Sequence, residues 1–241
     1  EDEIAESLKL NRLDYVASAA RSALEAVPFA GSLLAEIAGT VIPNQRIERI
    51  VRFAADLQKR IADLEEERVC AHLTNENFTD LVEEALRQAA RSTSDERCQH
   101  IASVVATSLS ADDVLFIESK HLLRLLGEIN DLEVIWLRSY LDPTMDGDEE
   151  FRSKHQEVLA PRLATMGSSQ AEIDDETIQQ SYKEHLEQIG LLRTRHKIDR
   201  KTGLPEFDRD GRQKIQGYEL TRLGRLLLRY LGFEDPLAQV D

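Results

Sequence analysis

The chain contains little cysteine, few aromatic residues and no recognisable catalytic motif. Of its 241 residues, two are cysteines and 5% are aromatic. Cys70 and Cys98 lie outside any CxxC or Cys/His cluster, so their spacing does not indicate a zinc site. Isolated cysteines of this kind are typical of buried, reduced thiols in an intracellular protein. We therefore expect a cytoplasmic location.

The six histidines and the acidic pairs do not form a catalytic or metal-binding pattern. The chain has no HExxH, GxGxxG, GxxxxGK[ST] or GxSxG sequence. Asp112-Asp113 and Asp174-Asp175 precede predicted helices, where the helix dipole favours negative charge. Asp208–Gly211 resembles part of a calcium loop but lacks the other ligands, so it is expected to form a turn. The sequence thus predicts no enzymatic activity, no cofactor and no metal site.

Positive charge is scarce over the whole chain. The 30 Lys and Arg residues are outnumbered by 45 Asp and Glu residues, which gives a formal net charge of -15. An acidic protein is repelled by nucleic-acid phosphates and anionic lipid head groups unless its basic residues are concentrated in one place. General nucleic-acid or membrane-surface binding is therefore not indicated.

The most apolar stretch, residues 16–42, is broken too often to span a membrane. A spanning helix needs about 20 largely uncharged residues, but Arg21, Glu25, Pro28 and Glu36 interrupt this stretch. A buried hairpin of two helices is expected instead. An amphipathic hairpin that inserts into a membrane on activation remains an alternative.

A long amphipathic helix is predicted from Asn44 to about His72. Its apolar residues alternate three and four positions apart, which is the spacing of a coiled-coil seam. This pattern allows the helix to pack within the monomer or against a second copy in a homo-oligomer. The seam residues are Ile47, Ile50, Ala54, Leu57, Ile61 and Leu64.

Further helices with short connections follow, so a mainly α fold is expected. Asn77 or Thr79 is predicted to begin one helix, and Ser94 to cap the next. Asp131 is predicted to cap a helix after a break. We place an N-terminal helical bundle in residues 1–129 and a second domain in residues 130–241.

The second domain ends in an order of elements that resembles a winged helix. A helix ends at Gly190, two strands are predicted at 191–198 and 214–220, and Thr221 caps a last helix. A glycine followed by Phe233 is typical of a Schellman ending. Winged-helix domains bind either nucleic acid or protein, so this ending predicts a binding module rather than a reaction.

The loop that would form the wing is basic, although the helix before it is acidic. Between residues 191 and 214, eight basic minus four acidic residues leave an excess of four positive charges. These basic residues are candidates for contact with DNA or a partner: Arg193, Arg195, Lys197, Arg200, Lys201, Arg209, Arg212 and Lys214. The helix at 174–188, in the position that reads bases, carries more acids than bases and would be repelled by DNA. Protein contact is therefore favoured over DNA reading.

Two segments are similar to the bacterial abortive infection alpha family. They are the apolar stretch Ala23–Leu34, with its Pro and Gly, and Ile42–Ile50, where Ile-Pro precedes an Arg-bearing amphipathic helix. The "LT-x-x-G" pattern at Leu220–Gly224 is a further similarity. The resemblance implies antiphage defence and brings no catalytic residues with it.

Three functional hypotheses follow. The first is a non-enzymatic antiphage-defence or prophage-associated protein that acts through protein contacts. The second is a DNA-binding regulator that uses the basic wing, and the third is a membrane-acting effector that uses residues 16–42.

Overall fold

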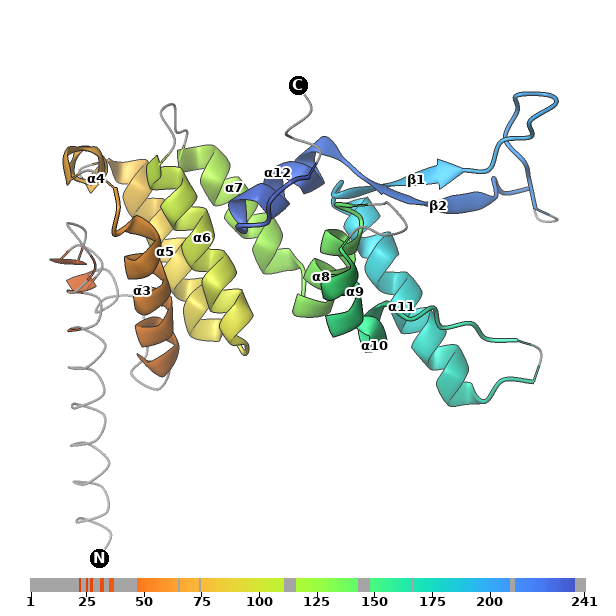
Figure 1. Cartoon of the computed structure of the whole chain (residues 1–241), viewed down its shortest axis with the longest axis horizontal. Coiled ribbons are helices and arrows are strands. Elements are labelled where there is room, and N and C mark those ends of the chain that lie inside the picture. Colours follow the sequence, from red (N-terminus) through yellow and green to blue (C-terminus); the bar gives the residue numbers. More distant parts are fainter. Residues whose placement is uncertain are drawn as a thin grey trace, which may run out of the picture. The chain divides into compact units, whose positions relative to one another are not determined.

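The computed structural model describes most of the chain after residue 46. The described ranges are 47–64, 66–73, 75–110, 116–142, 148–165, 167–208 and 211–236, preceded by single residues at 22, 25, 27, 31, 32, 35 and 36. They contain ten helices with defined bounds, α3 to α12, and one two-stranded antiparallel sheet (Figure 1). This confirms the predicted mainly α fold class with a small β-hairpin. Apart from those single positions, the apolar stretch 16–42 lies outside the described residues.

The chain forms two compact units. The first unit comprises Glu1–Gly127 with Tyr230–Gly232, and the second comprises Glu128–Arg229 with Phe233–Asp241. The sequence placed the boundary between residues 129 and 130. The helices of the first unit are α3 (Ile47–Ile61), α4 (Glu66–Leu73), α5 (Glu76–Arg91), α6 (Asp95–Ser110) and α7 (Phe116–Glu128).

The coiled-coil-like seam of α3 is buried inside the first unit. Helix α3 packs against α5 and α6, and its seam residues Ile50, Ala54, Leu57 and Ile61 are at most 1% exposed. These four side chains are therefore not available to a second copy. Leu64 follows the helix and is half-buried, while the side chain of Ile47 lies outside the described residues.

The single long helix predicted from Asn44 to His72 is wrong. The chain ends α3 at Ile61, turns through a hydrogen bond from the Leu64 amide to the Ile61 carbonyl (3.1 Å), and resumes as α4. No proline or glycine marks the turn. Tertiary packing accounts for it, because α4 contacts α5 and α6 and buries Val69 completely.

Local capping residues set the starts of α5 and α6. Ser94 caps α6 as predicted, since its hydroxyl accepts from the Arg97 amide at 3.1 Å. Helix α5 begins earlier than predicted, because the side chain of Asn75, rather than Asn77 or Thr79, accepts from a helix amide.

The two cysteines of the first unit lie in different surroundings. Cys98 is buried as expected, and this burial raises the pKa of its thiol. Cys70 is exposed, so the expectation of two buried thiols is wrong for this residue. It follows the buried Val69 on α4 and lies on the exposed side of that helix.

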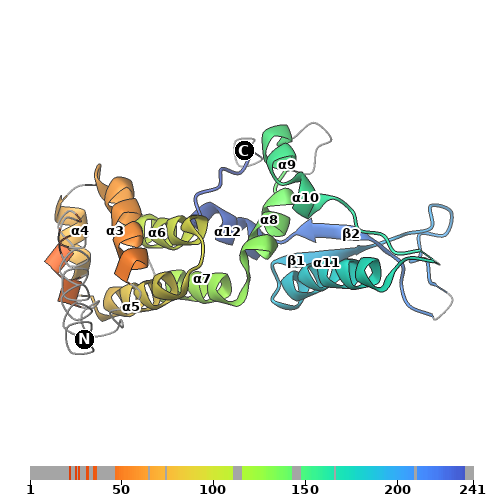
Figure 2. The same ribbon diagram turned by 90° about the horizontal axis from the view of Figure 1, so that it is seen from below.

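The second unit combines five helices with the sheet. Its elements are α8 (Asp131–Ser139), α9 (Glu149–Lys154), α10 (Gln156–Leu159), α11 (Gln170–Gln188), β1 (Leu192–His196), β2 (Ile215–Leu220) and α12 (Arg222–Tyr230). The short helices α9 and α10 precede the long α11, which packs against α8 and β1 (Figure 2).

Two capping boxes place α8 and α11. Asn130, one residue before the predicted Asp131, caps α8 with Glu133 as its reciprocal partner. Ser169 caps α11 with Glu172 in the same way. Helix α11 therefore begins at Gln170. The predicted start at Asp174 is wrong, because Ser169 rather than the acidic run caps the helix. Gly190 ends α11 with a positive φ of 77°, as the sequence predicted.

The hairpin β1–β2 projects from the end of α11 (Figure 1). Its strands pair in antiparallel register from Leu192 opposite Leu220 to Arg195 opposite Gly217. The register then shifts, and His196 lies opposite Ile215. This bulge leaves Gln216 as the extra residue beside the predicted Gly217.

Helix α12 lies close to the start of the hairpin. The Thr221 hydroxyl accepts from the Gly224 amide at 3.0 Å, which confirms the predicted cap. The Phe233 amide donates to the Leu228 carbonyl at 3.0 Å after Gly232, whose φ is 91°, as the predicted Schellman ending requires.

No helix in the described ranges combines the length and apolar character that a membrane crossing requires.

Candidate interaction surface on the hairpin

Three of the eight basic residues singled out from the sequence are ion-paired within the hairpin. Arg193 pairs with Glu219 on the opposite strand at 2.5 Å. Lys197 and Lys214 both pair with Glu206, at 3.0 and 3.4 Å. These partners neutralise part of the local positive charge. Arg209 lies outside the described residues.

Four basic side chains remain available to a partner. In the described part of the chain, none of these four side chains pairs with a carboxylate, and each is exposed: Arg195, Arg200, Lys201 and Arg212. Arg200, Lys201 and Arg212 lie in the end of the hairpin, which we call the tip and define as residues 197–208 and 211–215. The tip therefore keeps positive charge in an otherwise acidic chain.

The tip folds as three short backbone segments rather than as an open loop. The Lys197 amide donates to the Lys214 carbonyl, the Lys214 amide to the Glu206 carbonyl, and the Glu206 amide to the Lys197 carbonyl, each at 2.8 Å. Bridges between Ile198 and Pro205 and between Phe207 and Gln213 extend this pairing. The sequence predicts only a turn-rich loop here, because no local pattern indicates that the backbone of Glu206 pairs with both Lys197 and Lys214.

The tip has one polar and one apolar face. The side chains of Lys197, Glu206 and Lys214 must share a face, since they form ion pairs with one another. Side chains of neighbouring residues in extended backbone point to opposite faces. The other face therefore receives the apolar side chains that follow those three residues: Ile198, Phe207 and Ile215.

This apolar face is open to solvent. Ile198, Phe207 and Ile215 are 57%, 54% and 52% exposed, and the nearby Leu204 is 64% exposed. Four of the nine exposed large apolar side chains in the described residues thus fall within the tip. Single exposed apolar residues are ordinary, but several that share one face make that face a candidate interaction site.

Two carboxylates of the tip are held in their charged form by hydrogen bonds. Hydrogen bonding to Lys197, with a further contribution from Lys214, lowers the pKa of Glu206 below its ordinary value. Backbone amides of Lys201 and Thr202 likewise lower the pKa of Asp199, whose side chain closes the adjacent turn. The charged form of both carboxylates is therefore favoured, and both accept hydrogen bonds within the tip.

The acids of α11 bind residues of their own unit. Asp175 pairs with Arg162, and Glu176 accepts from the Ala164 amide at 3.2 Å. Glu187 accepts from the Thr194 amide of β1 at 3.1 Å. These roles could not be predicted from the sequence, because Arg162 and Ala164 lie in a stretch, residues 161–169, whose pattern is that of a loop.

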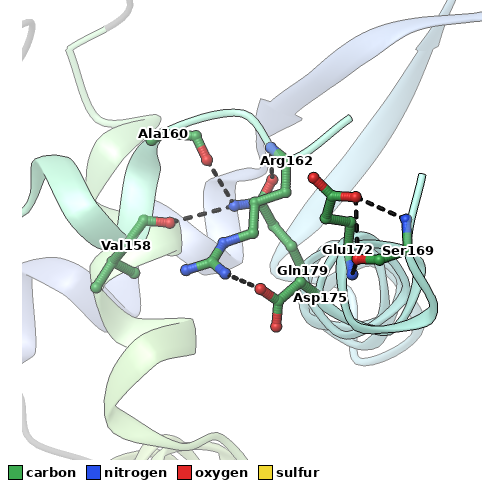
Figure 3. A network of polar contacts seen from close by, with 7 residues as sticks. All are labelled: Val158, Ala160, Arg162, Ser169, Glu172, Asp175 and Gln179. Atoms are coloured by element: carbon green, nitrogen blue, oxygen red, sulfur yellow. Dashed lines mark hydrogen bonds and ion pairs between the residues drawn. The ribbon is translucent and has the colours of Figure 1, made fainter. Parts of the chain in front are cut away.

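Gln179 joins that stretch to α11 (Figure 3). Its amide nitrogen donates to the carbonyls of Val158 and Ala160, at 3.3 and 2.9 Å, and its amide oxygen accepts from the Arg162 backbone at 3.1 Å. Gln179 is only 6% exposed. Residues 158–164 are thereby held along the N-terminal half of α11, which is the part that would approach bases in a DNA reader.

A second buried polar contact joins α8 to α11. One oxygen of the Glu133 carboxylate lies 2.6 Å from Nδ1 of His185, and the other accepts from the Asn130 amide at 2.7 Å. Glu133 is 3% exposed. This carboxylate is used in folding, and no group of three or more potential metal ligands occurs in the described ranges.

A pocket of about 410 Å³ lies beside the base of the hairpin. Two of its arginines serve the fold, since Arg225 binds both oxygens of Asp235 at 3.0 Å and Arg152 donates to the Ser139 and Asp142 carbonyls. Burial raises the pKa of its Tyr140 to about 12 and also raises the pKa of Tyr218. Both phenols are therefore neutral hydrogen-bonding groups rather than nucleophiles at neutral pH.

Comparison with known proteins gives no further guidance: no family model, no curated protein and no solved structure matches this chain.

Proposed function

We propose that the second unit is a winged-helix-like module that binds a protein partner through the apolar face of the hairpin tip. The observation that supports this most strongly is the exposed group Ile198, Phe207 and Ile215 on the face opposite the ion pairs. The surrounding Arg200 and Arg212 fit a partner surface in which carboxylates border an apolar patch. The partner class is therefore a folded protein with an acidic rim.

We further propose that the whole chain is a non-enzymatic antiphage-defence protein of the cytoplasm. The similarity of Ala23–Leu34 and Ile42–Ile50 to the abortive infection alpha family supports this role. The described side chains are consistent with it, because buried Glu133 and Gln179 bind groups of the fold, as do the α11 acids Asp175, Glu176 and Glu187. In this account the tip passes a signal by contact rather than by chemistry.

Photo-crosslinking tests the contact. A photoreactive phenylalanine analogue at position 207 is expected to give a defined protein adduct in phage-infected cells, because this side chain is 54% exposed on the apolar face. The same analogue at Gln188, an exposed position at the end of α11, is the matched control and should give no comparable adduct. Equal labelling from both positions would show that the tip has no special partner.

DNA binding by the hairpin is the second candidate. The unpaired cations Arg195, Arg200, Lys201 and Arg212 favour it, since such residues contact phosphates. Base reading by α11 is opposed by residues 158–164, which lie along its N-terminal half, and by the acids of that helix. In the crosslinking experiment, adducts to DNA instead of protein would favour this candidate over the first.

A further inference from the structure

Strand β2 has a free edge. Hydrogen bonds alternate along an antiparallel pair, so every second residue of a strand turns its amide and carbonyl away from the partner strand. The Thr221 amide donates to the Leu191 carbonyl at 3.1 Å, which makes these two residues a bonded pair. Counted from that pair along the observed register, Tyr218 and Leu220 turn their backbone groups outwards.

The opposite strand supports this assignment. Thr194 lies opposite Tyr218, and its amide donates to the Glu187 carboxylate at 3.1 Å rather than to β2. Helix α11 thus provides a hydrogen-bond partner for the outer edge of β1. In the part of the chain that the structure describes, the amides of Tyr218 and Leu220 have no such partner.

The pocket of about 410 Å³ lies beside this free edge. Tyr218, Glu219 and Leu220 all line it, together with Trp136 of α8 and Tyr140, which follows that helix. Neighbouring side chains of a strand point to opposite faces, so three consecutive residues line one pocket where it lies alongside the strand. Strand β1 occupies one edge of β2, and the pocket is therefore at the other.

Arginines dominate the charged groups of this pocket. Arg152, Arg195 and Arg225 line it, against the single carboxylate of Glu219. The charges of Glu219 and Arg225 are balanced by ion pairs with residues outside the pocket. Arg195 pairs with no carboxylate among the described residues, and Arg152 donates to two backbone carbonyls. The pocket therefore favours an anionic group.

Arg195 reaches the pocket from the other strand. It lies opposite Gly217 of β2, and no atom lies within 4 Å of the position that a Cβ would take there. Because Gly217 has no side chain, the Arg195 side chain has room to cross β2 at this point. The guanidinium is thereby placed next to the outward backbone groups of the strand edge.

We propose that an extended acidic segment of a partner protein adds to the free edge of β2 and places a carboxylate beside Arg195. In this mode of recognition the main-chain hydrogen bonds give affinity, and the pocket gives specificity. A peptide fits better than a phosphate backbone, which accepts hydrogen bonds but has no donor for the outward Tyr218 carbonyl. The site is separate from the apolar face of the tip, so the inference goes beyond the proposed function.

Selection of peptides on the full chain provides the test. From random peptides of about seven residues, the wild-type chain is expected to enrich sequences that contain Asp or Glu. Enriched peptides should bind the Arg195→Gln variant about tenfold more weakly, because a hydrogen bond to a charged group is lost. Arg212→Gln, which changes an exposed arginine of the tip, is the matched control and should bind like the wild type.

Two measurements report the backbone pairing. Hydrogen exchange at the Tyr218 and Leu220 amides should slow when an enriched peptide is bound, whereas exchange at the tip should not change. N-methylation of each peptide residue in turn should weaken binding at alternate residues, because only every second amide faces β2. Recognition of the side chains alone would not produce this alternation.

Three results would overturn the inference. They are the absence of any enriched sequence, equal affinity of the enriched peptides for the wild type and Arg195→Gln, and methylation effects that do not alternate. Peptides that lose affinity for Phe207→Ser but not for Arg195→Gln would bind the tip, and would thus support the proposed function while removing this inference. Binding of a short DNA duplex that Arg195→Gln abolishes, without any enriched peptide, would assign the pocket to phosphates instead.

Discussion

Replacing Gly224 with alanine is expected to destabilise the second unit by about 3 kcal/mol. Alanine is normally favoured over glycine in a helix by about 1 kcal/mol. Here a Cβ atom would lie 2.4 Å from the Leu191 carbonyl oxygen and 2.7 Å from Cδ1 of Leu220. The Leu191 oxygen also accepts from the Thr221 amide, so it cannot move without loss of that hydrogen bond.

Unfolding in urea, followed by the fluorescence of Trp136, measures this effect. Trp136 is the single tryptophan of the chain and lies in α8 of the same unit. Gly217→Ala is the matched control, because no atom lies within 4 Å of the Cβ position there. Equal midpoints for the two alanine variants would contradict the close approach of α12 to Leu191, the residue before β1.

Loss of the Gln179 amide is expected to lower the free energy of unfolding by about 2–3 kcal/mol. Gln179→Leu keeps most of the side-chain volume but leaves the Val158 and Ala160 carbonyls and the Arg162 amide without their partner. Unpaired polar groups in a buried position carry a full desolvation penalty. The segment 158–164 should then separate from α11.

The same fluorescence measurement tests this prediction, and hydrogen exchange at the Arg162 amide gives a local readout. Gln188→Leu is the control in the same helix, because Gln188 is exposed and should change stability by no more than about 0.5 kcal/mol. If the Arg162 amide were equally protected in wild type and Gln179→Leu, the role assigned to Gln179 would be wrong.

The parts of the fold that depend on neighbouring residues could be predicted from the sequence. The end of α11 at Gly190, the Thr221 cap and the turn before Phe233 each follow from local backbone requirements. The excess of basic residues between positions 191 and 214 could likewise be predicted from the sequence. Their pairing was not, because Glu206 joins Lys197 and Lys214 only after the tip has folded.

The parts that depend on distant contacts could not be predicted. Helix α3 ends at Ile61 without a local signal, since packing of α4 on α5 and α6 determines the turn. The sequence predicts a weak helix at 150–160 and a loop at 161–169, with no sign that Gln179 holds 158–164 against α11. The apolar face of the tip was hidden because Ile198, Phe207 and Ile215 come from three different segments. Only their common face identifies them as one surface.

Phage plating with a tip variant tests the central claim most directly. On the proposed antiphage function, cells that make the wild-type protein are expected to resist phage. Cells that make the Ile198→Ser, Phe207→Ser double variant are expected to plate phage as efficiently as cells without the protein. Ile117→Ser, which removes an exposed apolar side chain of the first unit, should protect like the wild type. Full protection by the tip variant, at the same protein level as the wild type, would contradict the account.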